Sequence, residues 1–282
     1  MTQAMPGDSG PGRPGSRPWW TSPWMIVVSV VVIVALVAGI ALYAWLGRGS
    51  NQAAGDVNSA RVVGLVTHVP ASSYDKVPPL PGGGDSSSFD STGTRPPAGT
   101  RPYVLYVGAE FCPFCAAERW SIITALSRFG SFSGLSLISS SSTDVFPNTP
   151  TFTFLNATFH SSYLTFTSRE LEDRNQQALQ TLTNQEAALE SHYNTAGYIP
   201  FVLIDDRYYQ VSAAYSPALL SGQTWGQIAN HLNDPSSATT RAILGEADII
   251  SAAICNSDGQ EPVGVCQSSG VEASMAGLPS KG

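Results

Sequence analysis

Four cysteines are the residues of this chain whose type and spacing point most directly to chemistry. Cys112 and Cys115 are separated by Pro113 and Phe114, which gives the motif Cys-Pro-Phe-Cys. A thiolate is a strong nucleophile, and two cysteines at this spacing can close and reopen a disulfide, which transfers two electrons. The motif therefore predicts thiol–disulfide exchange.

The segments around the motif predict a structure that activates one of the two thiols. The apolar run 102–110 is typical of a strand buried on both faces, and residues 112–129 change to the three- and four-residue spacing of a helix. Cys112 is then the N-cap and Pro113 takes the first helical position, where no N–H is needed. Unpaired backbone N–H groups and the helix dipole favour the Cys112 thiolate, while Cys115 lies on the same helical face.

Two other interpretations of this cysteine pair stay open. The first alternative is that the pair supplies two of the four ligands of a zinc site. Such a site needs two more ligands, and the 4 histidines are scattered without a second C-x-x-C. A permanently closed disulfide without a catalytic role is the other alternative. We expect no metal and no cofactor other than the redox-active disulfide Cys112–Cys115 itself.

The second pair, Cys255 and Cys266, encloses a loop-like segment after a predicted helix. A structural disulfide is the first interpretation, because closing a loop of this size stabilises a fold by about 3 kcal/mol in the chain-entropy model. The alternative is a second redox pair that exchanges electrons with Cys112 and Cys115.

The composition argues against a protein that binds nucleic acid. The 282 residues include 14 Lys and Arg against 21 Asp and Glu, which gives a net charge of −7 without a basic block. The hydrophobic fraction of 43% is large enough for a core. No Ser-His-Asp order, nucleotide-binding glycine pattern or phosphate loop is present in the sequence.

Residues 25–46 form an apolar segment without a charge. As a helix it is about 33 Å long, enough to cross a hydrocarbon core of about 30 Å. We expect a single-pass protein of the cell membrane with a cytoplasmic N-terminus, although Arg13 and Arg17 outweigh Arg48 only slightly. A cleaved signal peptide is the alternative, and in both cases the following domain is extracytoplasmic, where disulfides persist.

The periodicity predicts one mixed domain after this segment. Strands are expected at 61–69, 102–110 and 134–142, hairpins at 151–169 and 199–211, and helices at 112–129, 175–193, 225–232 and 239–254. The predicted organisation is a disordered cytoplasmic tail (1–24), the anchor (25–46), a linker (47–60), the outer domain (61–270) with a flexible Pro/Gly/Ser insertion (70–102), and a frayed tail (271–282).

The order of strand, Cys-Pro-Phe-Cys, helix and a later Ile199-Pro200 before an apolar strand resembles the thioredoxin superfamily. The strings GAEFCPFCAAERW (108–120) and LSRFG (126–130) are similar to an uncharacterised family of thioredoxin-like proteins of actinobacteria and archaea, often membrane-anchored. The resemblance spans about residues 61–270. It implies an α/β thioredoxin-like fold with a mixed sheet and insertions, a cis bond before Pro200, and an Ile199 backbone that positions a substrate chain.

Two acidic residues are candidates for the proton acceptor of Cys115. The strand 103–107 has no acid to match the buried carboxylate of thioredoxin, whereas Glu110 and Glu118 flank the motif. A solvated acid at a helix start explains each of them equally well. Arg119 either favours a thiolate or pairs with a carboxylate.

Several aromatic residues are expected either to rim the sulfurs, as a surface for an extended or unfolded polypeptide, or to belong to the core. They are Phe111, Phe114, Trp120, Tyr198 and Phe201, with the core favoured for Trp120 and Phe201.

These expectations combine into a membrane-anchored, extracytoplasmic thiol–disulfide oxidoreductase. Its substrates would be cysteine-containing proteins, and it would need a membrane or extracytoplasmic electron partner. The compartment and the Pro-Phe dipeptide favour oxidation of substrate dithiols. The alternative is a non-catalytic thioredoxin-like binding module, or a membrane-complex subunit, with structural disulfides.

Overall fold

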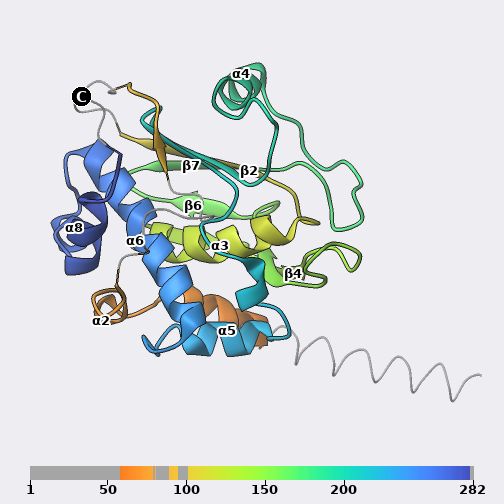
Figure 1. The fold of residues 1–282 in the computed structure, drawn as a ribbon, viewed down its shortest axis with the longest axis horizontal. Coiled ribbons are helices and arrows are strands. Elements are labelled where there is room, and N and C mark those ends of the chain that lie inside the picture. The colour runs from red at the N-terminus through yellow and green to blue at the C-terminus, as the bar shows by residue number, and fades with distance from the viewer. Residues whose placement is uncertain (1–57, 79, 81–88, 95–100, 280–282) are drawn as a thin grey trace, which may run out of the picture. The chain divides into compact units, whose positions relative to one another are not determined.

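The structure, a computed structural model, describes residues 58–78, 80, 89–94 and 101–279. A helix at residues 58–67 is followed by α2 (Ala71–Tyr74), α3 (Pro113–Leu126), α4 (Asn184–Tyr193), a 3-10 turn (Pro217–Leu219), α5 (Trp225–His231), α6 (Ala238–Asp258), α7 (Val263–Cys266) and α8 (Ser269–Met275). The strands are β1 (Asp90–Ser91), β2 (Tyr103–Gly108), β3 (Ser131–Ser133), β4 (Ser136–Ser139), β5 (Pro150–Thr153), β6 (Thr158–His160), β7 (Thr165–Glu170), β8 (Phe201–Ile204) and β9 (Tyr208–Val211). Figure 1 shows this mixed α/β arrangement.

A mixed sheet with the strand order β1-β9-β8-β2-β7 organises the described part of the chain. β7 is parallel to β2, whereas β8 is antiparallel to β2 and to β9. The buried strand and the hairpin predicted at 102–110 and 199–211 are thereby confirmed. β2 lies between β7 and β8, and its last residue leads directly into the Cys112 turn.

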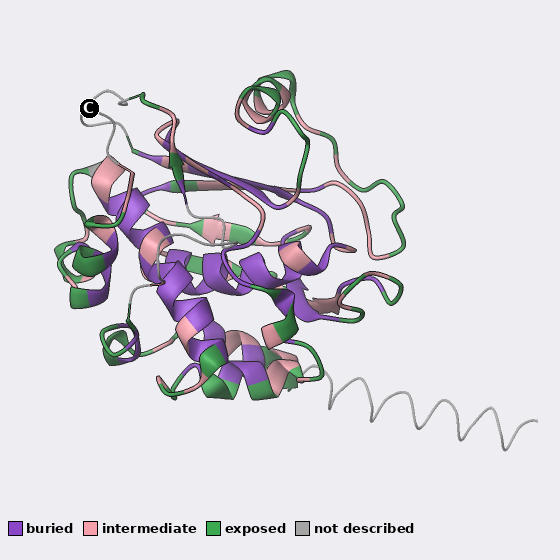
Figure 2. Ribbon diagram, in the orientation of Figure 1, coloured by how far each residue is buried: buried purple, intermediate pink, exposed green. Residues whose placement is uncertain are grey.

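Helices cover the two faces of this sheet unequally. On one face, Val104 and Tyr106 of β2 join the main core together with buried side chains of α3 and α6. On the other face, Leu105 and Val107 form a smaller cluster that α4 covers through Leu189 and its neighbours. Figures 1 and 2 show this difference: α3 and α6 are largely buried, whereas α4 lies across the sheet from α3 and keeps exposed residues.

α3 is buried on nearly every side, and this controls what its polar residues can do. Trp120, Ile123 and Leu126 are completely buried, but so are Glu118 and Arg119. A buried charge needs a partner within the protein, because removal from water is costly. The structure must therefore supply partners for both residues.

The strand predicted at 61–69 is wrong, since residues 58–67 form a helix. Val62 and Val66 are buried four residues apart, which places them on one helical face against the main core. The β-branched residues suggested a strand, but burial of this face outweighs their propensity.

The hairpin predicted at 151–169 is also wrong, because β5 pairs with β4, β6 with β3, and β7 with β2. Alternation of aromatic residues with Thr and Ser indicated strands but not their partners.

The helix predicted at 175–193 begins only at Asn184. The Asp173 side chain accepts N–H groups of Asn175 and Gln177 and forms a turn there, while Thr183 and Glu186 form a capping box. The spacing Thr-x-x-Glu is a helix-start signal that was visible in the sequence.

Two segments predicted to be flexible or frayed are structured where they are described. Within the 70–102 insertion, Tyr74 of α2 and Phe89 are 2% exposed, and β1 pairs with β9. In the tail predicted at 271–282, α8 packs on α6, and Val271 is completely buried. Single apolar residues anchor both segments, a signal that their Pro, Gly and Ser content obscured.

Candidate active site

The Cys-Pro-Phe-Cys turn has the local geometry that the sequence predicts. Cys112 is the N-cap of α3, Pro113 follows at the helix start, and the Cys115 N–H donates to Cys112 Sγ at 3.3 Å. Both cysteines are free thiols, with Cys112 5% exposed and Cys115 completely buried. The sulfur that can meet a substrate is therefore that of Cys112.

The two thiols have opposite electrostatic environments. The hydrogen bond with Cys115 lowers the pKa of Cys112 against the opposing effect of burial, and the Arg119 charge also lowers it. Burial raises the pKa of Cys115 well above its usual value, and its bond to Cys112 acts in the same direction. Cys112 is accordingly the better nucleophile, and Cys115 is the protonated, protected partner.

The backbone of Ile199 lies directly beside the first cysteine. The Cys112 thiol donates to Ile199 O at 3.7 Å, and the Ile199–Pro200 peptide bond is cis. Pro200 immediately precedes β8, the antiparallel neighbour of β2. The structure thus brings Ile199 and Pro200 to Cys112, as the resemblance implied.

A buried ion pair supports the site from within the fold. Arg119 donates from Nε and Nη2 to the carboxylate of Glu170 at 2.9 and 2.5 Å, and both side chains are completely buried. Arg119 Nη2 also donates to Ala109 O at 2.8 Å, just before the cysteine turn. The pair ties α3 to the end of β7 while its cation still acts on both cysteines.

Glu170 was not identified from the sequence. It ends β7 directly after Arg169, which pairs with Glu186. In the sequence, the neighbouring Arg169 and Glu170 do not show which of them has a distant partner. The signal available was an acid at the end of a strand rich in aromatic residues and Thr.

The two proposed proton acceptors of Cys115 form hydrogen bonds with other side chains. Glu110 accepts from Thr153 Oγ1 at 2.6 Å. Glu118 accepts from Gln210 Nε2 at 3.4 Å, and it interacts with Glu246 of α6. Burial raises the pKa of Glu118 well above its usual value, with Glu246 as the second cause, so a solvated acid does not describe it.

The aromatic residues divide between the core and the surroundings of the sulfurs. Trp120 and Phe201 are completely buried, as expected for core residues. Phe111 and Phe114 are half-buried beside the cysteines, and Tyr198 is exposed.

The second cysteine pair is bonded in the structure. The Cys255–Cys266 disulfide joins the end of α6 to α7, and both residues are at most 1% exposed. Exchange with another thiol needs an accessible sulfur, so this burial favours the structural interpretation.

The described ranges contain neither a cluster of metal ligands nor a helix suited to span a membrane. No group of three or more His, Cys, Asp or Glu there is arranged to hold a metal ion. No described helix is long and apolar enough to cross a membrane, and the predicted anchor 25–46 lies outside the described residues.

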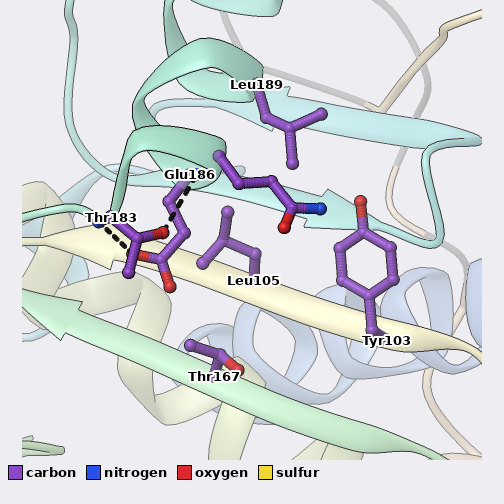
Figure 3. Close-up of a pocket in the computed structure, with 7 residues that line it drawn as sticks. Tyr103, Leu105, Thr167, Thr183, Glu186 and Leu189 are labelled. Carbon is purple, nitrogen blue, oxygen red and sulfur yellow. Dashed lines mark hydrogen bonds between the residues drawn. The ribbon is translucent and has the colours of Figure 1, made fainter.

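The cavity in Figure 3 has a volume of about 210 Å³ and lies on the sheet face opposite α3. Leu105 of β2 and Leu189 of α4 point into it from opposite sides. Its lining is completed by polar and aromatic side chains and contains no cysteine: Tyr103, Thr167, Thr183, Gln185 and Glu186. It is therefore separate from the candidate active site.

Comparison with known proteins gives one result at the level of a family. No curated protein and no solved structure matches the chain. The sequence profile of a domain of unknown function, DUF929, matches residues 97–256, a range that includes Cys112, Cys115, Glu170 and Pro200. Because this match covers more than half of the chain, the protein belongs to the DUF929 family.

Proposed function

We propose that this protein is a thiol–disulfide oxidoreductase of the thioredoxin superfamily that acts on protein cysteines through Cys112 and Cys115. The observation that carries the proposal is the environment of Cys112 Sγ. It receives the Cys115 N–H at 3.3 Å and lies 3.7 Å from Ile199 O, at the start of a buried helix. The first contact favours a thiolate, and the second provides a backbone acceptor next to the reacting sulfur.

The reaction follows from the unequal thiols. The Cys112 thiolate attacks one sulfur of a substrate disulfide, that S–S bond breaks, and the released substrate thiolate takes a proton from water. Cys115 then gives its proton to water and its sulfur attacks Cys112 Sγ. The mixed disulfide breaks, the second substrate thiolate leaves and takes a proton from water, and the Cys112–Cys115 bond closes. Two electrons pass from the protein to the substrate, and the reverse sequence oxidises a substrate dithiol.

The protein acts outside the cytoplasm in this proposal, held to the membrane by residues 25–46. Cysteine-containing proteins are its substrates, and a separate membrane or extracytoplasmic protein exchanges electrons with it. The apolar length of the segment and the disulfide Cys255–Cys266 support this location.

The test is covalent trapping with the full-length chain in its host membrane. Cys115→Ala should accumulate mixed disulfides with partner proteins through Cys112, visible as adducts that a reductant removes. The matched control is Cys112→Ala, which keeps one cysteine of the motif but loses the attacking sulfur and should trap nothing. Equal adducts in the two variants would contradict the assigned nucleophile. No adducts in either, with biological function kept in the double variant, would instead favour a binding module.

A further inference from the structure

Among the described residues, Val145 and Tyr198 have the most exposed large hydrophobic side chains, at 71% and 65%. Scattered exposed apolar residues are ordinary on a protein surface. These two are distinguished by their positions, because each belongs to a segment that contacts the Cys112 turn.

The Val145 segment is the loop between β4 and β5. The Ser141 N–H donates to Phe111 O at 2.8 Å, and the Phe146 ring meets the Phe114 ring edge to face with centroids 6.0 Å apart. The Asn148 N–H closes the loop on Ser141 O at 2.9 Å. The loop that presents Val145 to solvent therefore contacts Phe111, just before the cysteine motif, and Phe114 within it.

The Tyr198 segment is fixed by hydrogen bonds to the side chain of Asn194, four residues earlier. The side chain of Asn194, 4% exposed, accepts the Tyr198 N–H at 3.0 Å and donates to Tyr198 O at 2.7 Å. The next residue is Ile199, whose carbonyl lies beside Cys112. An exposed aromatic side chain is thus attached directly to the backbone group that borders the reacting sulfur.

We propose that Val145 and Tyr198 bind large apolar side chains on either side of the reacting cysteine in a polypeptide substrate. The inference rests on the proposed function and names its substrate class. An extended segment offers backbone N–H groups to Ile199 O and places its side chains against Val145 and Tyr198. A small thiol is too short to contact Val145 or Tyr198 while its sulfur meets Cys112. Burial of apolar area on Val145 and Tyr198 then supplies affinity for such a segment.

The test uses the reduced full-length chain in detergent and three mixed disulfides of thionitrobenzoate. One is made with a peptide whose cysteine has leucines on both sides, one with the same peptide carrying serines instead, and one with N-acetylcysteine. In each, the Cys112 thiolate attacks the cysteine sulfur, the S–S bond breaks and coloured thionitrobenzoate leaves with the electron pair. Its release gives the rate constant.

The variant is Val145→Ser combined with Tyr198→Ser. We expect it to lower kcat/KM for the leucine peptide by about tenfold, because two partly buried apolar contacts are lost. The other two substrates should react at unchanged rates. The matched control is Val263→Ser with Tyr163→Ser, which removes the same side-chain types from exposed positions on α7 and before β7 and should change nothing.

Two results would overturn the inference. If the variant slows all three substrates equally, the loops support the site and do not select substrates. If no substrate is affected, Val145 and Tyr198 contact something else, such as a lipid surface. Failure of the proposed function is a different outcome, in which the wild-type chain reacts with N-acetylcysteine–thionitrobenzoate no faster than Cys112→Ala does.

Discussion

Replacement of Glu246 by Gln should make the stability of this protein much less dependent on pH. Glu246 of α6 is 1% exposed, and burial raises its pKa from 4.5 to about 8, with a hydrogen bond from Gln210 acting in the opposite direction. The other titratable groups of this buried cluster are Glu118 of α3 and Tyr215. Within the described part of the chain, no cation lowers the pKa of Glu118, Tyr215 or Glu246.

The direction and the size of the pH effect on the free energy of unfolding follow from this rise in the pKa of Glu246. A carboxyl that binds its proton more tightly in the folded state contributes stability below pH 4.5, and this contribution is lost as the pH rises through about 8. Each pH unit within that interval is worth about 1.4 kcal/mol. Between pH 5 and pH 8 the wild-type protein should therefore lose about 3 to 4 kcal/mol through Glu246 alone. The variant lacks this loss, and its Glu118 pKa is also raised less.

The assay is urea unfolding of the full-length chain in a nonionic detergent at several pH values, followed by near-ultraviolet circular dichroism. The free energy of unfolding should be similar for the two proteins at pH 5 and higher for Glu246→Gln at pH 8. Asp248, whose pKa burial raises to about 6, is present in both proteins and cancels in the difference. Glu272→Gln, on the exposed face of α8, is the control and should follow the wild type. Parallel profiles for Glu246→Gln and wild type would refute the reasoning.

Three further changes test the site and its support. Glu170→Gln leaves the Arg119 cation buried without its counter-charge, so the free energy of unfolding in urea should fall by about 3 to 5 kcal/mol; a loss below about 1 kcal/mol would argue against a supporting ion pair. Cys255→Ala with Cys266→Ala should lower the free energy of unfolding by about 3 kcal/mol and leave thiol exchange intact; lost exchange would make that pair an electron relay. Alkylation of the reduced chain at several pH values, followed by peptide mass spectrometry, measures how fast each cysteine of the motif reacts. The rate for Cys112 should have a pH midpoint below 9.0, because its thiol pKa is lowered. Faster labelling of Cys115 would reverse the assigned roles.

The parts of the structure that could be predicted are those with local signals. The N-cap role of Cys112 follows from the residues on either side of it, and the hairpin 199–211 from two adjacent apolar segments. The family resemblance added what spacing alone could not give, namely that Ile199 and Pro200 lie beside a cysteine far away in the sequence. In each case the sequence contained the geometry within a few residues or within a known motif.

The parts that could not be predicted depend on contacts between distant segments. Arg119 and Glu170 are 51 residues apart, and they meet only because β7 lies parallel to β2. The sequence suggested instead that segment 161–169 pairs with segment 151–159, and this pairing gives no reason to connect Glu170 with α3. The helix 58–67 is a related case, because its β-branched residues are helical only through burial of one face against a core formed by later segments.

The surroundings of α3 explain how two ionisable residues, Glu118 and Arg119, can follow the cysteine motif inside the fold. A helix buried on nearly every side can carry Glu118 and Arg119 only if each finds a partner, and consecutive helical residues point about 100° apart. Arg119 therefore reaches the sheet edge at Glu170, while Glu118 reaches Gln210 of β9 and Glu246 of α6. These contacts fix α3 from two directions, about one turn after the N–H that Cys115 directs at Cys112. The bond from that N–H lowers the pKa of Cys112, so under the proposed function the buried polar residues contribute by fixing the helix that directs it.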